Sequence, residues 1–237
     1  DMPQSGVNKL QVGRSVYDFY MKEWAGVDPD NGNPLWYMDE KDANDNLTGK
    51  RVTTSDYASA SYYYVNKSSL PKVYGGFNTS LSWKGFDLSA IFAYSIGGYI
   101  YNRDITMILH NGSLEGRDWS TEILKRWTPE NRYTDVPALS TTSNNWNSAS
   151  TRFLQNNSYM RLKNLTLSYD LPKQWISKLA LSSVQVFVQG DNLFTIHRNQ
   201  GLDPEQGITG ITYYRYPAMR TISGGINLSS VSYTHLT

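Results

Sequence analysis

The chain has 237 residues and no cysteine, and 22 Lys and Arg nearly balance 21 Asp and Glu, which gives a formal net charge of +1. These counts exclude disulfides, thiolate metal sites and cysteine nucleophiles, and they provide no basic field that would favour nucleic acid as a partner. The aromatic content of 14% argues against disorder, and the absence of apolar runs of about 18 residues argues against membrane-spanning helices.

Six strands are predicted along the chain. The first covers residues 15–26, and a long connector over 27–72 follows. The second and third form a hairpin within 74–101, because residues 77–84 and 86–96 alternate between apolar and small or polar side chains and meet at Lys84-Gly85. The segment 86–96 has the length that a tilted transmembrane β-strand needs, about 9–11 residues.

The remaining strands follow a second long connector over residues 102–157. This connector is predicted to hold one short helix over 114–127, with Ser120 as its N-cap and Thr128-Pro129 as its stop. Each of the last three strands has one apolar face and one small or polar face. They cover residues 164–171, 183–189 and 221–229.

The connectors alternate between two classes of length. Lys84-Gly85 and residues 172–181 are short, whereas 27–72, 102–157 and 198–216 are long and rich in Asn, Gly, Ser, Tyr and Trp. Outer-membrane barrels alternate in this way, with short periplasmic turns and long extracellular loops. The pattern therefore predicts an all-β fold, an incomplete antiparallel transmembrane barrel, with a soluble or surface-exposed carbohydrate-binding β-sandwich as the alternative.

Several short motifs occur in a fixed order between about residue 12 and residue 228. They are 24–29 (WAGVDP), 31–34 (NGNP), 71–77 (PKVYGGF), 83–88 (WKGFDL), 126–131 (RWTPEN), 158–169 (SYMRLKNLTLSY), 190–194 (GDNLF), 201–205 (GLDPE) and 216–217 (YP). In order and spacing these motifs resemble the C-terminal part of SusC/RagA-like TonB-dependent outer-membrane transporters. Residues 1–229 are accordingly predicted to be part of such a barrel, and residues 230–237 resemble a translated sequencing adapter and are predicted to be non-native.

The resemblance implies a barrel of about 22 strands, located in the outer membrane of a Bacteroidetes-type bacterium. It also implies import of glycans, oligosaccharides or peptides, energised by the TonB complex through an N-terminal plug that this sequence does not contain. The implied partners are a SusD-like surface lipoprotein, the TonB complex, the lipid bilayer and the imported substrate. Six strands alone would leave open edges with unpaired backbone groups in lipid, so the segment is not expected to function by itself.

No constellation for catalysis or metal binding is apparent, and neither enzymatic activity nor a cofactor is expected. The motifs G-x-S-x-G, H-E-x-x-H and the P-loop are all missing. The run over residues 28–34 has oxygen-bearing side chains at alternate positions, but turn formation is favoured over a Ca²⁺ loop.

The candidate substrate-binding residues are aromatic side chains in or beside the long connectors, because flat rings can stack on sugar faces while neighbouring polar groups bind hydroxyls. The competing interpretation is that these rings pack the loops together or form a belt at the membrane interface. The six candidates are Trp36, Tyr37, Trp119, Trp146, Tyr213 and Tyr214.

Overall fold

A computed structural model describes residues 4–110, 112, 116–140, 145–177 and 181–230. The chain divides into two units. The first comprises residues 1–70, 98–156 and 205–215, and the second comprises residues 71–97, 157–204 and 216–237. None of the helices in the described ranges is long and apolar enough to cross a membrane.

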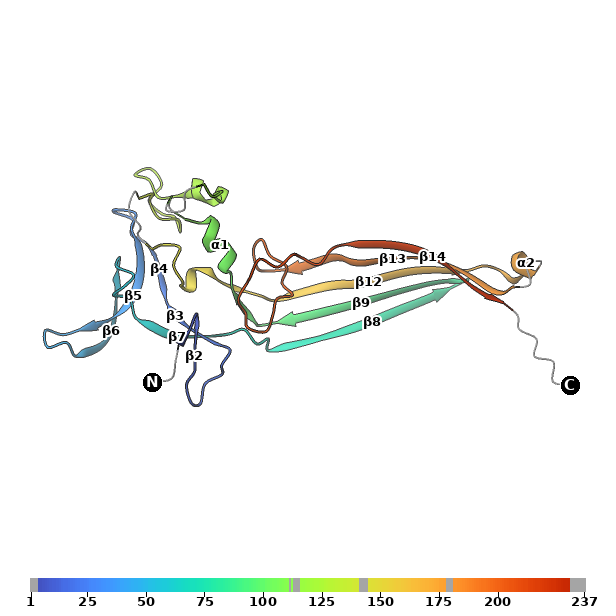
Figure 1. Cartoon of the computed structure of the whole chain (residues 1–237), viewed down its shortest axis with the longest axis horizontal. Helices are drawn as coiled ribbons and strands as arrows, with labels where there is room; N and C mark the ends of the chain where they lie inside the picture. Colours follow the sequence, from blue (N-terminus) through green and yellow to red (C-terminus); the bar gives the residue numbers. More distant parts are fainter. Residues whose placement is uncertain (1–3, 111, 113–115, 141–144, 178–180, 231–237) are drawn as a thin grey trace. The chain divides into compact units, whose positions relative to one another are not determined.

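The second unit is built on one antiparallel sheet of five long strands, which lie side by side in Figure 1. In spatial order they are β14 (Thr221–Ser230), β13 (Leu181–His197), β12 (Tyr159–Asp170), β9 (Phe86–Ile96) and β8 (Val73–Trp83). The short helix α2 (Lys173–Ile176) lies in the connector between β12 and β13. Five of the six predicted strands are therefore confirmed here, and several extend beyond their predicted bounds.

The turn between β8 and β9 explains why the predicted hairpin forms. Trp83 pairs with Phe86, so the loop has only two residues. Lys84 and Gly85 both have positive φ, 50° and 86°, as the type I′ turn requires to match the twist of the flanking strands. Lys84 places its Nζ 4.8 Å from the centroid of the Trp83 ring.

The strand register gathers the apolar side chains on one face of the sheet. We call this the apolar face. It includes Val73, Phe77, Leu81 and Trp83 of β8, Phe86, Leu88, Phe92 and Ile96 of β9, Leu165, Leu167 and Tyr169 of β12, Val186, Val188, Phe194 and Ile196 of β13, and Ile222, Ile226 and Leu228 of β14.

The opposite face, called the polar face, presents mainly small, hydroxyl, amide and charged side chains, with Ile91 and Phe187 among the exceptions. It includes Asn78, Ser80 and Ser82 of β8, Asp87, Ser89 and Ser95 of β9, Asn164, Thr166 and Ser168 of β12, Gln185, Gln189 and Asp191 of β13, and Thr221, Ser223 and Asn227 of β14. This division into two faces is the one predicted from the alternation.

Much of the apolar face is open rather than packed against a second layer. Leu81, Leu88, Val188 and Ile226 are 67%, 39%, 48% and 63% exposed. A β-sandwich covers one face of each sheet with the other sheet, and side chains this exposed are not covered. The apolar face therefore needs another apolar environment.

A β-bulge between β12 and β13 accounts for the motif over residues 190–194. The register between β12 and β13 shifts between the pair Asn164 and Asp191 and the pair Leu162 and Phe194. Within the bulge Asn192 adopts φ 53°, and its amide donates to the carbonyl of Met219 at 3.2 Å. A Cβ on Gly190 would lie 2.6 Å from a methyl carbon of Leu193, so a larger residue here would require the Leu193 side chain to move.

A buried ion pair fixes the segment that follows β13 to the polar face. Arg161 Nη2 lies 2.6 Å from Asp203 Oδ1, and the two side chains are only 3% and 7% exposed. Arg161 Nε also donates to Thr195 Oγ1 at 2.8 Å, and Asp203 Oδ2 accepts from the backbone N–H of Ala218 at 2.7 Å. The motif over residues 201–205 therefore shapes the base of a loop.

The first unit contains short strands and short helices. Its sheets are β1 (Gln4–Ser5), β2 (Asn8–Lys9), β3 (Asp18–Lys22) and β7 (Tyr62–Ser68), then β4 (Trp24–Val27), β5 (Pro34–Lys41) and β6 (Leu47–Thr54), then β10 (Tyr99–Tyr101) and β11 (Leu154–Asn156). Its helices are α1 (Arg103–Ile108) and the 3₁₀ helices η1 (Thr121–Lys125) and η2 (Thr151–Phe153). Its largest buried apolar cluster centres on Phe19, Met21 and Phe153.

Three predictions for the first unit are wrong. The strand expected over residues 15–26 splits at Glu23, because β3 pairs with β7 whereas β4 pairs with β5. The expected connector over 27–72 contains three strands, and α1 was not predicted. The expected helix is only the 3₁₀ helix η1, although Ser120 caps it as predicted by accepting from the Glu122 N–H at 3.3 Å.

Parts of two predictions fall outside the described residues. Residues 113–115 belong to the expected helix, and residues 231–237 belong to the expected non-native tail. Ser230 is the last residue of β14, and the assignment of residues 230–237 to a tail stays a prediction.

Replacing Asp203 by Ala should lower the free energy of unfolding by about 3–5 kcal/mol, because the guanidinium of Arg161 would then be buried without its carboxylate. The matched control is Asp30→Ala, which removes an ion pair with Arg132 at 3.4 Å whose side chains are 85% and 50% exposed. That control should cost less than about 1 kcal/mol. Urea-induced unfolding measures both, and equal losses would contradict the assigned role of the buried pair.

Candidate ligand-binding site

The six aromatic candidates occupy different environments. Trp36 and Trp146 are completely buried, whereas Trp119, Tyr213 and Tyr214 are 42%, 55% and 70% exposed. Tyr37 is half-buried. The structure therefore does not bring the six together at one surface, and their role as substrate contacts stays a prediction.

The two buried tryptophans pack within the first unit. The Trp36 ring lies edge-on to Trp24 and Tyr57, with centroid distances of 5.6 and 5.2 Å. Trp146 belongs to a small buried cluster with Ile123 and Val136. These positions match the packing interpretation that the sequence left open, because neither ring has free surface for a ligand.

Tyr213 and Tyr214 lie on a segment that is fixed by its backbone. The N–H of Tyr101 donates to the carbonyl of Gly210 at 2.7 Å, and the N–H of Thr212 donates to the carbonyl of Tyr101 at 3.2 Å. Tyr214 adopts φ 47°, and its N–H donates to the Asp104 carboxylate at 3.2 and 3.3 Å. The left-handed conformation is costly for a tyrosine, so these contacts hold its ring in an exposed position.

We call the exposed pair Tyr213 and Tyr214, together with Arg103, the tyrosine platform. The Arg103 guanidinium carbon lies 5.5 Å from the centroid of the Tyr213 ring. Asp104 belongs to the first turn of α1, where Asn102 caps the helix by accepting from the Ile105 N–H at 3.0 Å. The platform thus combines flat apolar surface with a cation on a rigid base.

A second group of tyrosines lines β3 and β7. The Tyr20 ring stacks on Tyr62 at 5.5 Å and is tilted against Tyr64 at 4.9 Å. Beside them Lys22 is only 4% exposed, and its Nζ donates to the carbonyls of Tyr57 and Ala58. Burial lowers the pKa of Lys22, and the nearby Asp56 carboxylate partly offsets this effect.

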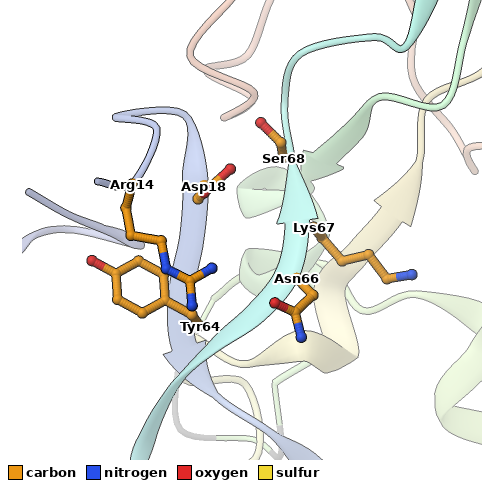
Figure 2. A pocket seen from close by; sticks show the side chains of 6 residues that line it. All are labelled: Arg14, Asp18, Tyr64, Asn66, Lys67 and Ser68. Carbon is orange, nitrogen blue, oxygen red and sulfur yellow. The ribbon is translucent and has the colours of Figure 1, made fainter. Parts of the chain in front are cut away.

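A polar pocket of about 240 Å³ adjoins these tyrosines. Figure 2 shows the Arg14 side chain lying over the Tyr64 ring, with Asp18 on the neighbouring strand. The lining residues are Arg14, Asp18, Tyr64, Asn66, Lys67 and Ser68. The sequence did not predict this pocket, because most of its residues come from β7, which lies inside the expected connector.

Metal binding finds no support in the described part of the chain, which contains no group of three His, Asp or Glu that could hold an ion. The Asp28 carboxylate is occupied by its own turn, since it accepts from the Asp30 N–H at 2.9 Å and from the Asn31 amide at 2.7 Å. This geometry agrees with the turn interpretation of residues 28–34.

Two of the sequence motifs contact each other in the first unit. The indole N–H of Trp127 donates to the carbonyl of Pro29 at 3.1 Å, and the N–H of Ala138 donates to the carbonyl of Gly32 at 2.9 Å. A Cβ on Gly32 would lie 2.6 Å from the Trp127 ring. The motifs over residues 31–34 and 126–131 thus hold two distant loop segments together.

Comparison with known proteins places these observations in a family context. No family model matches the chain. The chain is 28% identical over 233 residues to the TonB-dependent receptor P3 of Formosa agariphila, covering 92% of this chain and 22% of P3. It is 27% identical over 223 residues to the TonB-dependent receptor SusC of Bacteroides thetaiotaomicron, covering 94% of this chain and 20% of SusC.

A solved structure is similar as well. A chain in the structure of the RagAB peptide importer in its "open-open" state is 33% identical, with a TM-score of 0.82, over 97% of this chain and 24% of that chain. The similarity confirms the predicted antiparallel β-barrel architecture, of which this chain contains an incomplete part. The chain spans about a quarter or less of the length of these relatives.

The base of the tyrosine platform should respond to alkaline pH through Tyr101. Burial raises the pKa of Tyr101 to about 12, against a smaller opposing effect of Arg103. The unfolded chain releases this proton near pH 10, so the stabilisation is complete below pH 10 and is lost as pH rises toward 12. The loss at pH 11 is about 1.4 kcal/mol.

Tyr101→Phe should leave the free energy of unfolding at pH 7 nearly unchanged. Between pH 9 and 11 the variant should lose less stability than the parent protein, because it lacks the Tyr101 hydroxyl that ionises on unfolding. Urea unfolding at a series of pH values measures the difference between the two proteins. Parallel pH profiles would contradict the assignment.

Proposed function

We propose that this chain, which belongs to the SusC/RagA-like TonB-dependent receptors, forms part of an outer-membrane barrel that imports oligosaccharides, other glycans or peptides. The observation that supports this proposal most directly is the two-faced sheet of the second unit. Much of its apolar face is exposed, and its opposite face is mainly polar, with Ile91 and Phe187 among the exceptions. Lipid tails would cover the first face and water would fill the space behind the second.

The strand dimensions suit this environment. β8 and β9 each have 11 residues, which corresponds to a length of about 36 Å at about 3.3 Å per residue. A tilt of about 45° reduces this length to the height of about 25 Å that the apolar band of an outer-membrane barrel spans. The aromatic pair Phe86 and Tyr169, 4.4 Å apart on the apolar face, would lie at the interface near the short turn.

The sheet requires neighbours to function in a membrane. β8 and β14 are its two edges, and unpaired N–H and C=O groups at an edge cost several kcal/mol each in hydrocarbon. We therefore propose that other strands of the receptor pair with these edges and close the barrel. The curated relatives, whose length this chain spans only in part, are long enough to supply them.

The energy source and protein partners are inferred from the family. The relatives are TonB-dependent receptors, and we propose that TonB drives import through a plug in another part of the receptor. By the same reasoning a SusD-like lipoprotein captures substrate at the cell surface of a Bacteroidetes-type bacterium. No catalytic step is proposed, because the relatives are receptors and importers by name.

Substrate contact is proposed for the tyrosine platform. Tyr213 and Tyr214 expose flat rings beside a guanidinium, which suits an oligosaccharide ring or a peptide side chain. The soluble β-sandwich that the sequence left open as an alternative is not favoured, because much of the apolar face is exposed among the described residues and the similar proteins are a TonB-dependent receptor and a peptide importer by name.

The orientation of the sheet can be tested with two adjacent residues of β9. Leu88→Arg would place a charge on the apolar face and should destabilise the receptor in lipid by about 2–4 kcal/mol. Ser89→Arg would place the same charge on the polar face and should have little effect. The measurement is the fraction folded in liposomes by heat-modifiable migration, and equal tolerance of both substitutions would reject a lipid-facing apolar surface.

The tyrosine platform can be tested by removing its rings. Tyr213→Ala with Tyr214→Gly deletes both, and glycine accepts the positive φ at position 214. Substrate affinity should fall about two- to tenfold, the usual contribution of aromatic contacts. Tyr133→Ala is the control, because Tyr133 is 92% exposed and lies outside the platform. Unchanged affinity in the double variant would exclude the platform from substrate binding.

A further inference from the structure

Arg14 is held in place yet lacks an anionic partner. Its guanidinium carbon lies 4.7 Å from the centroid of the Tyr64 ring. The Tyr64 hydroxyl donates to the carbonyl of Lys9 at 3.2 Å, and its ring contacts Tyr20, so the stacking surface is fixed. Within the described ranges the Arg14 side chain makes no ion pair or hydrogen bond.

The same unit contains a complete version of this arrangement. The Arg51 guanidinium carbon lies 3.7 Å from the centroid of the Tyr63 ring, and Arg51 Nη1 also binds the Glu23 carboxylate at 2.8 Å. A guanidinium stacked on a ring keeps its N–H groups free along its edge, where a carboxylate can accept them. Arg14 has the ring but not the carboxylate, and the space beside it is the pocket of about 240 Å³.

Two further polar side chains of the pocket have no partner among the described residues. Asn66 lies within the irregular pairing of β3 and β7 and adopts φ 53°, and its side-chain amide makes no hydrogen bond. The Asp18 carboxylate is likewise unpaired, although it lines the same pocket as Arg14. By contrast, Lys67 Nζ already donates to the Tyr99 hydroxyl at 3.0 Å.

From this arrangement we infer that the pocket binds a carboxylate group of the imported substrate. The carboxylate accepts from the edge of Arg14, the Asn66 amide provides a further hydrogen-bonding group, and Asp18 accepts from a hydroxyl or N–H group next to the carboxylate. Such a group occurs in a uronic acid residue of an acidic oligosaccharide and at the carboxyl end of a peptide. The inference rests on the proposed import function for the source of the ligand.

The size of the pocket limits what enters it. Pockets for drug-sized ligands have volumes of about 300–1,000 Å³, whereas this pocket has about 240 Å³. It therefore accepts one residue of a chain, and the remainder of the substrate lies outside. The lining carries two cations, Arg14 and Lys67, against one anion, Asp18, so a single carboxylate balances its formal charge and a second one would be repelled.

The experiment measures equilibrium binding to the complete receptor that contains this chain, purified in detergent, by isothermal titration calorimetry. Two matched ligand pairs are used: an oligogalacturonate with its carboxyl-reduced neutral form, and a short peptide with its C-terminally amidated form. At least one acidic member should bind about tenfold or more tightly than its neutral partner, as expected for a charge-assisted hydrogen bond. The pair that shows the preference identifies the source of the carboxylate.

Substitutions then assign this preference to the pocket. Arg14→Ala should abolish the preference for the acidic ligand over its neutral partner. Arg14→Lys should retain only part of this preference, because an ammonium cannot donate through two parallel N–H groups. Asn66→Gly, which keeps the positive φ, should weaken it. Arg117→Ala is the control, because Arg117 is also exposed and unpaired in the described part of the chain but lies outside the pocket.

Two results would overturn the inference: neither acidic ligand is preferred over its neutral partner, or the preference survives in Arg14→Ala. These results are distinct from a failure of the proposed function. A receptor that binds the acidic ligand through Arg14 but does not import it in cells would leave the pocket assignment intact and would contradict the import role. Thermal unfolding of Arg14→Ala checks that any loss of binding does not reflect misfolding.

Discussion

The structure depends on one constraint: backbone hydrogen bonds join neighbouring strands of the sheet, while the two sides of each strand face different environments. Side chains alternate strictly along a strand, so the register of five strands decides where each apolar residue lies. The bulge near Asn192 shifts the register of β13 against β12 and still keeps Phe194 and Ile196 on the apolar face. The continuity of that face is what makes a lipid environment the best match.

The loops are built by contacts between segments that are distant in sequence. Each contact uses a feature that a sequence motif supplies: the missing side chain of Gly32 beneath Trp127, or the carboxylate of Asp203 against Arg161. At both places polar groups are satisfied by partners within the chain. These motifs therefore maintain loop shape, which explains why they mark the family without indicating what it binds.

The sequence predicted the sheet well and the first unit poorly, for a physical reason. In β9 one face is apolar throughout its 11 residues, and the other is polar or small except at Ile91. In contrast, β5 and β6 are short, with mixed polar and apolar residues on both faces, and their pairing is decided by tertiary contacts. Sequence could not distinguish the buried Trp36 from the exposed Tyr214, and it could not place Asn66 at an irregularity of pairing with β3.

The most specific guide to function in this chain is whether a charged or aromatic side chain already has a partner within the fold. Arg51 and Arg161 have carboxylate partners, so replacing either would disturb the fold before it disturbed recognition. Arg14 has the stacking surface without the carboxylate, and the rings of the tyrosine platform stay 55% and 70% exposed. Arg14, Tyr213 and Tyr214 are exposed, so water meets them in the free protein, and an external ligand can replace that water without breaking a contact within the chain.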